Sequence, residues 1–325
     1  MSTQNLMGTV LCLTMNPAVD VSTHTPRVVP ADKLRCGPAQ REPGGGGLNV
    51  ARVVQRLGGH STALYPAGGP SGAWLDAHLR DAGLPLQRIA VQGDTRESFT
   101  VQAQDSGLEY RFVLPGPLLA SAEWHACLDA VDATPQAPAF VVASGSLPPG
   151  VPDDFYARVS TRARRRGVRT ILDSSGAALA EGLGGGGVYL VKPNLRELGE
   201  LLGETLDDPS RWRGAAQQLI ERGQAEVVAL SLGERGALLV TGHSAWRAPA
   251  LPITLVSSVG AGDSFVGAMA WGLQAGHSLP DAFAWGVAAG SAALITPGTG
   301  LCRAEDIQRL RPQVLVQELG PGQRS

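Results

Sequence analysis

The stretch V-L-C-L-T-M, residues 10–15, is a short and mostly apolar run that predicts a buried β-strand. Similar runs follow at residues 139–143, 169–172, 188–191 and 226–230. Between them, apolar residues recur with helical spacing, often after Ser, Asp or Asn. The predicted helices span residues 48–57, 73–81, 122–131, 153–166, 195–202 and 211–222. Strands that alternate with helices predict an α/β protein with a mostly parallel sheet and helices on both faces.

Two stretches interrupt this alternation, residues 20–42 and 98–114. The second reads S-F-T-V-Q-A-Q-D-S-G-L-E-Y-R-F-V-L, and its alternating polarity around a D-S-G-L turn predicts a β-hairpin. A hairpin cannot be a crossover helix, so we expect it to join the first stretch in a small accessory sheet. That sheet is a candidate lid of about residues 17–42 and 95–116 within a single domain, 1–325. Two Ala/Gly-rich helices, 260–276 and 279–295, are predicted near the end of the chain.

The composition narrows the class of protein. Of 325 residues, 43% are hydrophobic and 17% are charged, which excludes disorder as the main state. The formal net charge of −2 gives no broad basic field, so small molecules are expected as partners and nucleic acid is not. No apolar run approaches the ~20 residues that span a bilayer, and the first residues lack a signal-peptide pattern. A cytoplasmic protein without membrane association is predicted.

Cysteine, histidine and lysine positions bear on the chemistry. Four scattered cysteines without a C-x-x-C pair are expected to be structural thiols, and the six histidines form no zinc-binding pattern. Of the 27 basic residues only Lys33 and Lys192 are lysines, so both are examined for a role in a site. A run of arginines from Arg162 to Arg169 is predicted to be a solvated helix end, where cations suit the helix dipole.

The segment S-S-V-G-A-G-D-S-F-V-G-A-M-A, residues 257–270, follows an extended stretch and opens an apolar helix. Small residues let a ligand approach the backbone, and the free N–H groups of a helix start bind anions. Asp263 at this start would lie where a transferring phosphoryl group collects negative charge. It can equally be a carboxylate that the helix dipole favours, and the local sequence leaves both interpretations open.

Two further segments combine a turn with polar side chains. The run E-P-G-G-G-G-L-N-V-A-R, residues 42–52, lacks the ending of a Walker A loop, so it is either a plain turn or a place where Asn49 meets a small polar ligand. In V-K-P-N-L-R-E-L, residues 191–198, Asn194 and Glu197 fit a capping box. The same residues would place a carboxylate at the carboxyl end of a strand, where magnesium could be held through waters. Lys192 adds a cation that could pair with phosphate.

Together these motifs resemble a known family. G-G-G-G-L-N-V-A-R, S-G-S-L-P-P-G, D-S-S-G, K-P-N-L-R-E and G-A-G-D-S occur in this order in the ribokinase-like (pfkB) carbohydrate kinases. The resemblance covers about residues 10–302 and implies a ribokinase-like α/β fold with a small β-sheet lid. Within the family, K-L-R-C, E-P-G-G-G-G, P-A-G-G, Y-R-F-V-L-P-G and V-A-A-G-S-A-A resemble the bacterial minor-type 6-phosphofructokinases.

The resemblance implies roles for individual residues. Asp263 resembles the family's catalytic base, and the anion hole beside it matches Gly260, Ala261 and Gly262. Sugar contacts are implied for Asp20, Gly45, Gly46, Asn49 and Ser144, and lid cations that receive the sugar phosphate for Lys33 and Arg96. The ATP site is implied at Lys192, Asn194, Ser231, Gly233, Gly236, Val287 and Ser291.

Two cation sites are also implied. Glu197 belongs to the N-x-x-E motif that places Mg²⁺. A monovalent-cation site for K⁺ is implied beside the anion hole, at Ser257, Val259, Ala293, Thr296 and Gly298. The sequence departs from the family there, because Thr296 and Gly300 replace an expected asparagine and arginine. Val29 replaces an aromatic residue expected on the lid, which bears on regulation by a second nucleotide.

The resemblance implies an ATP-dependent kinase of the glycolytic type that converts D-fructose 6-phosphate to fructose 1,6-bisphosphate. Tagatose 6-phosphate and fructose 1-phosphate are alternative acceptors. An alternative of another class is a nucleotide-binding regulator without catalysis, against which the presence of both Asp263 and Glu197 argues. A small sheet with one apolar face has little core of its own to cover it, so a homodimer through the lid is expected.

Overall fold

A computed structural model describes residues 8–134 and 136–320. Its main sheet has ten strands in the order β14-β13-β12-β11-β10-β9-β8-β1-β4-β5. Their bounds are β14 Gln317–Leu319, β13 Ala245–Ala248, β12 Ala237–Thr241, β11 Ala225–Ser231, β10 Val188–Val191, β9 Arg169–Asp173, β8 Phe140–Ser144, β1 Val10–Leu13, β4 Ser61–Ala67 and β5 Leu86–Ala90. The strands from β11 to β5 are parallel, and β12, β13 and β14 extend the sheet in antiparallel pairs.

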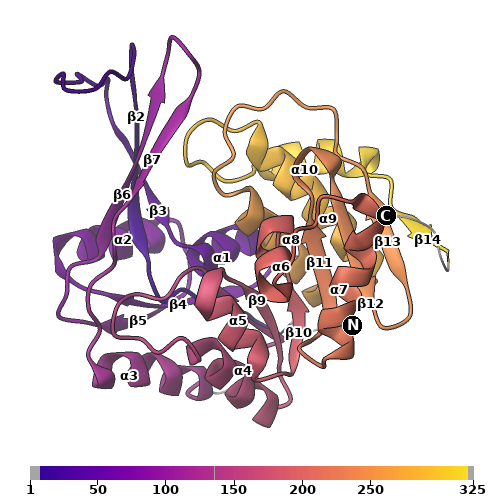
Figure 1. The fold of residues 1–325 in the computed structure, drawn as a ribbon. Coiled ribbons are helices and arrows are strands. Elements are labelled where there is room, and N and C mark those ends of the chain that lie inside the picture. The colour runs from indigo at the N-terminus through magenta and orange to yellow at the C-terminus, as the bar shows by residue number, and fades with distance from the viewer. Residues whose placement is uncertain (1–7, 135, 321–325) are drawn as a thin grey trace, which may run out of the picture.

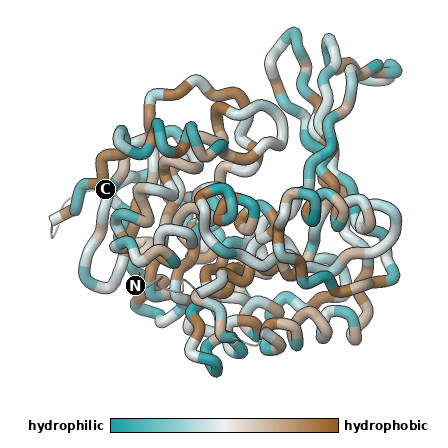
Figure 2. The backbone as a smooth tube through the Cα atoms, turned by 180° about the vertical axis from the view of Figure 1, so that it is seen from behind, coloured by the Kyte–Doolittle hydropathy of each residue, from teal (hydrophilic) through white to brown (hydrophobic). Residues whose placement is uncertain are grey.

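Helices cover both faces of this sheet, as predicted (Figure 1). On one face lie α1 Gly46–Arg56, α2 Gly69–Asp81, α8 Ala261–Gln274, α9 Leu279–Leu294 and α10 Ala304–Leu310. On the other lie α3 Ser121–Asp132, α4 Phe155–Arg165, α5 Gly176–Gly184, α6 Leu195–Leu202 and α7 Trp212–Glu221. Each layer buries its own apolar core against the sheet, and many hydrophobic segments run through the middle of the molecule (Figure 2).

The strand order changes direction at β1. The chain passes from β1 to β4 on one side, and returns later to β8 on the other. In parallel sheets, ligands bind outside the carboxyl ends of the strands at such a switch point. The fold therefore places a binding site above the ends of β1 and β8.

A second sheet stands beside the main one, with the order β3-β2-β6-β7 (Figure 1). Its strands are β3 Gln40–Gly44, β2 Ala18–Thr25, β6 Arg96–Ala103 and β7 Glu109–Val113. The hairpin predicted at residues 98–114 is present, with Phe99 opposite Phe112. Pairing of β2 with β6 joins the two interrupting stretches, as expected. We call this the accessory sheet.

The two faces of the accessory sheet differ in chemistry, because side chains alternate along each strand. One face carries Asp20 on β2 and Arg96 on β6. Arg96 lies opposite Ala18, two positions before Asp20, so both side chains are on the same face. The other carries Val21, Phe99 and Phe112, which form one row across β2, β6 and β7. The first face is polar, and the second is the apolar face.

Small residues bring α1, α8 and α9 close together. A Cβ on Gly267 would lie 2.7 Å from Cβ of Val53, and one on Gly286 would lie 2.7 Å from Cγ of Met269. Larger side chains would push these helices apart and open the core. The Ala/Gly-rich composition of the predicted helices 260–276 and 279–295 therefore reflects close helix packing.

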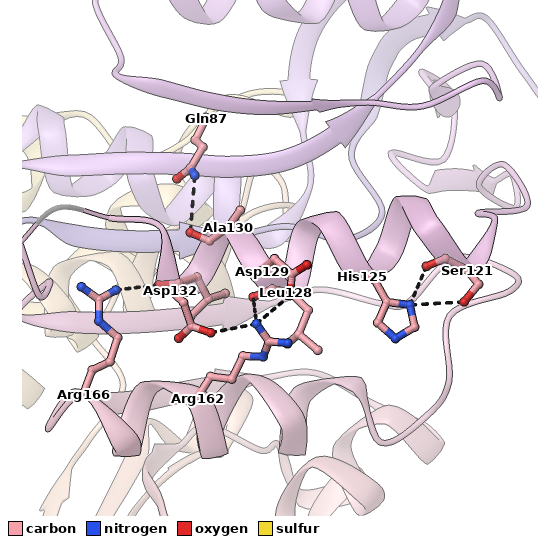
Figure 3. A network of polar contacts seen from close by, with 10 residues as sticks. Gln87, Ser121, His125, Leu128, Asp129, Ala130, Asp132, Arg162 and Arg166 are labelled. Atoms are coloured by element: carbon pink, nitrogen blue, oxygen red, sulfur yellow. Dashed lines mark hydrogen bonds and ion pairs between the residues drawn. The ribbon is translucent and has the colours of Figure 1, made fainter.

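Two arginines at the end of α4 bind the neighbouring helix (Figure 3). Arg164 and Arg165 are exposed there, as predicted. Arg162 on α4 donates to Asp132 at 2.7 Å and to the carbonyl oxygen of Leu128 at 3.3 Å. Arg166 donates to the carbonyl oxygens of Val131 and Thr134 at the end of α3. The prediction for Arg162 and Arg166 was wrong, because their guanidinium groups satisfy the unpaired carbonyls that end a neighbouring helix.

Several elements were not predicted, among them β4, β5, α5, α10 and the antiparallel strands β12, β13 and β14. The helix predicted at 73–81 begins earlier, at Gly69. Over the part of the chain that the structure describes, no helix is long and apolar enough to cross a membrane.

Candidate active site

Polar side chains gather at the carboxyl edge of the main sheet. Ser144 ends β8, Asp173 ends β9, Lys192 follows β10, and Ser231 ends β11, so that four adjacent parallel strands each contribute one. Oγ of Ser144 donates to Oδ2 of Asp173 at 3.5 Å, and Nζ of Lys192 lies 3.1 Å from Oδ1 of Asp173. This edge is where an α/β protein binds its ligands.

The glycine run closes over the switch point between β1 and β8. Gly45 has a φ of 116°, which residues with a Cβ rarely adopt. A Cβ on Gly46 would overlap Oγ of Ser144, and one on Gly47 would overlap the carbonyl oxygen of Leu13. The run is therefore glycine because the backbone presses directly against the ends of both strands, and it begins α1 there.

Asp263 lies in the first turn of α8, after Gly260, whose φ of 73° starts the helix. Nδ2 of Asn49 on α1 donates to Oδ2 of Asp263 at 2.8 Å. The first turn of a helix has unpaired N–H groups, here at Gly260, Ala261 and Gly262, of which Gly262 is exposed. The arrangement places a carboxylate beside a group of backbone donors that can bind an anion.

The pKa of Asp263 is raised to about 7. Burial is the main cause, and the neighbouring carboxylate of Asp173 adds to it, whereas the hydrogen bond from Asn49 and the charge of Lys192 oppose it. The side chain is half-buried, so one edge still meets solvent. A carboxylate with a pKa near 7 suits a general base at neutral pH.

Lys192 follows β10 and is buried, with its Nζ close to the start of α8. Its Nζ lies 3.5 Å from the position that a Cβ on Gly262 would take. Burial lowers the pKa of Lys192, but the carboxylates of Asp173, Glu197 and Asp263 raise it further, so that the pKa ends above its ordinary value. Lys192 is therefore a permanent cation beside the N–H groups of α8, a combination that can bind an anion.

Asn194 and Glu197 form the predicted capping box at the start of α6. Oδ1 of Asn194 accepts from the backbone N–H of Glu197, and Oε2 of Glu197 accepts from that of Asn194, each at 2.9 Å. Asn194 also forms a β-bridge with Ser231. The turn after Ser231 holds Gly233 at a φ of 60° and Gly236 at 88°, and a Cβ on Gly236 would overlap the carbonyl oxygen of Ala248.

The polar face of the accessory sheet contributes Asp20 and Arg96. Burial raises the pKa of Asp20, and Arg96, Arg111 and Arg52 oppose this. Nη1 and Nη2 of Arg96 donate to the carbonyl oxygens of Leu114 and Asn16, both at 3.0 Å. Nε of Arg96 is buried and has no partner among the described residues.

Lys33 stands apart from these residues. It is exposed in the loop between β2 and β3, and within the described residues it makes no hydrogen bond or ion pair. The loop lies at the end of the accessory sheet that is distant from the main sheet (Figure 1).

The residues assigned to a monovalent cation lie beside the start of α8. Backbone N–H groups of Val256 and Ser257 donate to the carbonyl oxygen of Leu294, which joins the segment before α8 to the end of α9. Oγ of Ser257 donates to Glu109 of the accessory sheet at 3.4 Å. Gly298 lies against the side chain of Ser22 on the same sheet, since a Cβ there would be 3.2 Å from Oγ of Ser22. Val259, in the segment before α8, is buried, and so are Ala293 and Thr296 at the end of α9.

Val287 and Ser291 lie buried on α9. The neighbouring Gly290 brings α9 against the start of α8, where its Cβ would lie 3.4 Å from the carbonyl oxygen of Ala261. No hydrogen bond joins either residue to Lys192 or Ser231 over residues 8–134 and 136–320.

Sequence reasoning missed two residues of the site. Asp173 received no role, although its place at the end of a predicted strand was a signal. Arg52 lies in the glycine-rich motif, and no local pattern predicts that its Nη1 donates to Oδ1 of Asn49 at 3.4 Å.

The site defines a class of protein. Residues 10–306 match the model of the pfkB family carbohydrate kinases, and the chain belongs to this family. It is a kinase that transfers phosphate to a sugar hydroxyl. The chain is 50% identical over 300 residues to "ATP-dependent 6-phosphofructokinase isozyme 2" of Mycobacterium tuberculosis. This alignment covers 92% of the chain and 88% of the relative. The chain is 32% identical over 310 residues to "1-phosphofructokinase" of Bacillus subtilis, with 95% and 100% covered.

Solved structures agree with this similarity. Crystal structures of phosphofructokinase-2 from Escherichia coli, one in complex with fructose-6-phosphate and one with potassium, each superpose with a TM-score of 0.89 at 40% identity. Each alignment covers 94% of this chain and 99% of the other. The ribokinase-like fold expected from the sequence is confirmed.

Proposed function

We propose that the protein is an ATP-dependent 6-phosphofructokinase, which converts D-fructose 6-phosphate to fructose 1,6-bisphosphate. The observation that carries this function is the meeting of Asp263, Asn49 and Lys192 at the carboxyl edge of the sheet, beside the first turn of α8. The identity of 50% to a relative named for this activity supports the choice of substrate over that of 1-phosphofructokinase, at 32%.

The geometry suits an in-line transfer. Asp263 takes the proton of the acceptor hydroxyl, whose oxygen attacks the γ-phosphorus of ATP, while the bond to the β–γ bridging oxygen breaks and ADP leaves. Backbone N–H groups of Gly260, Ala261 and Gly262 stabilise the charge that spreads over the moving phosphoryl oxygens. Lys192 holds positive charge at the same place, since it is buried beside Gly262.

ATP would lie along the ends of β10 and β11, with contacts implied by the family at Lys192, Asn194, Ser231, Gly233, Gly236, Val287 and Ser291. Gly233 in the turn after β11 has open space where a Cβ would lie, so a nucleotide can approach the backbone closely there. Glu197 would hold Mg²⁺ through one carboxylate oxygen, because Oε2 is already used by the capping box. When bound, the ion neutralises charge on the phosphates.

The sugar would lie under the polar face of the accessory sheet. Asp20, Gly45, Gly46, Asn49 and Ser144 are assigned to its hydroxyls and phosphate ester. Arg96 supports the assignment of a phosphate site, because its buried Nε has no partner among the described residues. On this proposal residues 17–42 and 95–116 form the lid of a single domain, and the role of the exposed Lys33 stays a prediction.

A K⁺ site beside the anion hole is also proposed, at Ser257, Val259, Ala293, Thr296 and Gly298. The buried Oγ1 of Thr299 in the same loop has no partner among the described residues, which fits a cation that prefers oxygen ligands. The replacements at Thr296 and Gly300 weaken the match to the family, so a potassium titration of the activity is the direct test.

A homodimer through the apolar face of the accessory sheet completes the proposal. Phe99 and Phe112 on this face are 36% and 55% exposed, although they lie on a sheet. A second copy of the same face covers them by a two-fold contact. The cytoplasmic location stays a prediction.

One assay tests the proposed function. ADP formation is measured with ATP and Mg²⁺ in the presence of fructose 6-phosphate, tagatose 6-phosphate or fructose 1-phosphate. The proposal requires the highest kcat/KM with fructose 6-phosphate. Binding of ATP without turnover of any of the three would favour the regulator instead.

A further inference from the structure

Arg52 is a buried arginine on α1 that reaches both the accessory sheet and the candidate site. Its Nη2 donates to Oε2 of Glu42 at 2.7 Å, and its Nη1 donates to the carbonyl oxygen of Pro43 at 2.9 Å, both on β3. The same Nη1 lies 3.4 Å from Oδ1 of Asn49, one helical turn earlier on α1. The residue is 9% exposed, so little water competes for these contacts.

The contacts of Arg52 fix the orientation of the Asn49 amide. An amide has a donating and an accepting end of nearly the same shape, so shape alone does not choose between its two orientations. A guanidinium only donates and a carboxylate only accepts. Between Arg52 and Asp263, Oδ1 must therefore face the arginine, and Nδ2 must face the carboxylate, as it does at 2.8 Å.

We infer that Arg52 is a positioning residue for phosphoryl transfer: it holds the amide of Asn49 so that one oxygen of Asp263 is bound and the other is presented to the acceptor hydroxyl. The inference rests on the proposed role of Asp263 as the base. Arg52 itself does not contact Asp263. Arg52 is held by Glu42 and Pro43 on β3. The edge strand of the accessory sheet is therefore connected to Asp263 through the side chains of Arg52 and Asn49.

The charges around Asp263 predict a measurable signature. Asp173 and Asp20 raise the pKa of Asp263, whereas Lys192 and the hydrogen bond from Asn49 lower it. Without Arg52 the Asn49 amide can rotate, and its oxygen can then accept a hydrogen bond from the protonated form of Asp263. That form is favoured, and the opposing hydrogen bond to the carboxylate is lost. The acid limb of the pH profile of kcat/KM then moves to higher pH.

The experiment measures kcat, KM and the pH profile of kcat/KM for full-length variants at Arg52. Arg52→Met is expected to lower kcat about 10- to 100-fold, as misplacement of a reacting group does, with KM for ATP unchanged and the acid limb at higher pH. Arg52→Lys keeps the charge, and should recover part of kcat and of the pH profile. In Glu42→Gln the amide oxygen can still accept from Nη2 of Arg52, and the carbonyl oxygen of Pro43 still accepts from Nη1, so the variant should keep the wild-type acid limb.

Arg162→Met is the matched control, because Arg162 also binds a carboxylate and a carbonyl oxygen between two elements (Figure 3). Its partners are on α3, which contributes no residue to the candidate site. A wild-type kcat and acid limb in Arg52→Met, with Asp263→Asn inactive, would overturn the inference alone. Retained activity in Asp263→Asn would overturn the proposed base as well. Where Arg52→Met does not fold, Arg52→Lys gives the answer, since an unchanged acid limb with full kcat contradicts the inference.

Discussion

Asn49 and Asp263 are joined by a hydrogen bond of 2.8 Å, although 214 positions separate them in the sequence. The contact fastens the start of α1 to the start of α8, and so brings the glycine run and the anion-binding turn to one point. The proposed base is placed by this packing of two helices.

Asp263→Asn is expected to lower kcat at least ~10²-fold, because an amide of nearly the same size cannot accept the proton of the sugar hydroxyl. Affinity for ATP should stay within a few-fold, since the nucleotide contacts lie elsewhere. Steady-state kinetics and ATP titration of the same variant measure both. Activity within tenfold of the wild type would remove Asp263 from the mechanism.

The pH profile should follow the ionisation of Asp263. Its pKa is raised to about 7, so kcat/KM is expected to rise with pH and to level off above about 7. The raised pKa also means that the folded state binds this proton more tightly than the unfolded chain, whose ordinary value is 3.8. Ionisation therefore costs stability progressively as the pH rises between those two values. The Tm of Asp263→Asn relative to wild type should increase over this range, and a constant difference would contradict the assignment.

Glu197→Gln distinguishes a metal role from a structural one. If Glu197 holds Mg²⁺, the variant should need more magnesium, while KM for the sugar phosphate changes little. Glutamine at this position still closes the capping box around Asn194. Magnesium titration of the activity is the measurement, and an unchanged requirement would leave Glu197 with the capping role alone.

Arg96→Ala tests the phosphate site on the accessory sheet. Loss of a charge-assisted contact costs ~1.5 to 3 kcal/mol, which raises KM for fructose 6-phosphate about 10- to 150-fold. KM for ATP, measured in the same assay, should change little and is the internal control. Equal changes in both values would indicate that the variant damages the sheet, because Arg96 also binds Leu114 and Asn16 through their carbonyl oxygens.

Phe112→Glu tests the dimer. A carboxylate in the middle of the apolar face should dissociate the two copies, since burying an unpaired charge is costly. Light scattering at assay concentration would then give a monomer for the variant and a dimer for the wild type. Leu118→Glu is the control, because Leu118 is 74% exposed and lies outside the accessory sheet. A monomeric and fully active wild type would refute the paired lids.

The main features of the fold could be predicted because they depend on local patterns. The apolar run at Val10 and the helical spacing after Leu195 are decided by their own residues and by burial on one or two faces. The hairpin between Phe99 and Phe112 follows from alternation and a turn. The strands β12 and β13 pair with the strands just before them in the chain, so they were missed although a hairpin pattern was available. The three-residue edge strand β14 pairs with β13, which is remote in sequence. No local pattern indicates such pairing.

The candidate site was predictable where a motif has its own geometry, as in the capping box of Asn194 and Glu197. The ion pair between Lys192 and Asp173 forms because β9 and β10 are neighbours in the sheet. The order of strands in a sheet cannot be read from a local sequence pattern. Arg52 and the arginines of α4 were missed for another reason. An arginine side chain is long and flexible, so its partner is selected by the tertiary structure and not by neighbours in the chain.

The hydrogen bond between the two helix starts also bears on how the protein is made. Synthesis proceeds from the N-terminus at roughly 5 to 20 residues per second, and N-terminal parts fold first. The glycine run leaves the ribosome early, but its partner at position 263 emerges after most of the sheet. Contacts between such distant segments form late, because a long loop must close before they contribute. The capacity to move a phosphoryl group is therefore acquired in the last stage of synthesis, and nascent chains that end before α8 should consume no ATP.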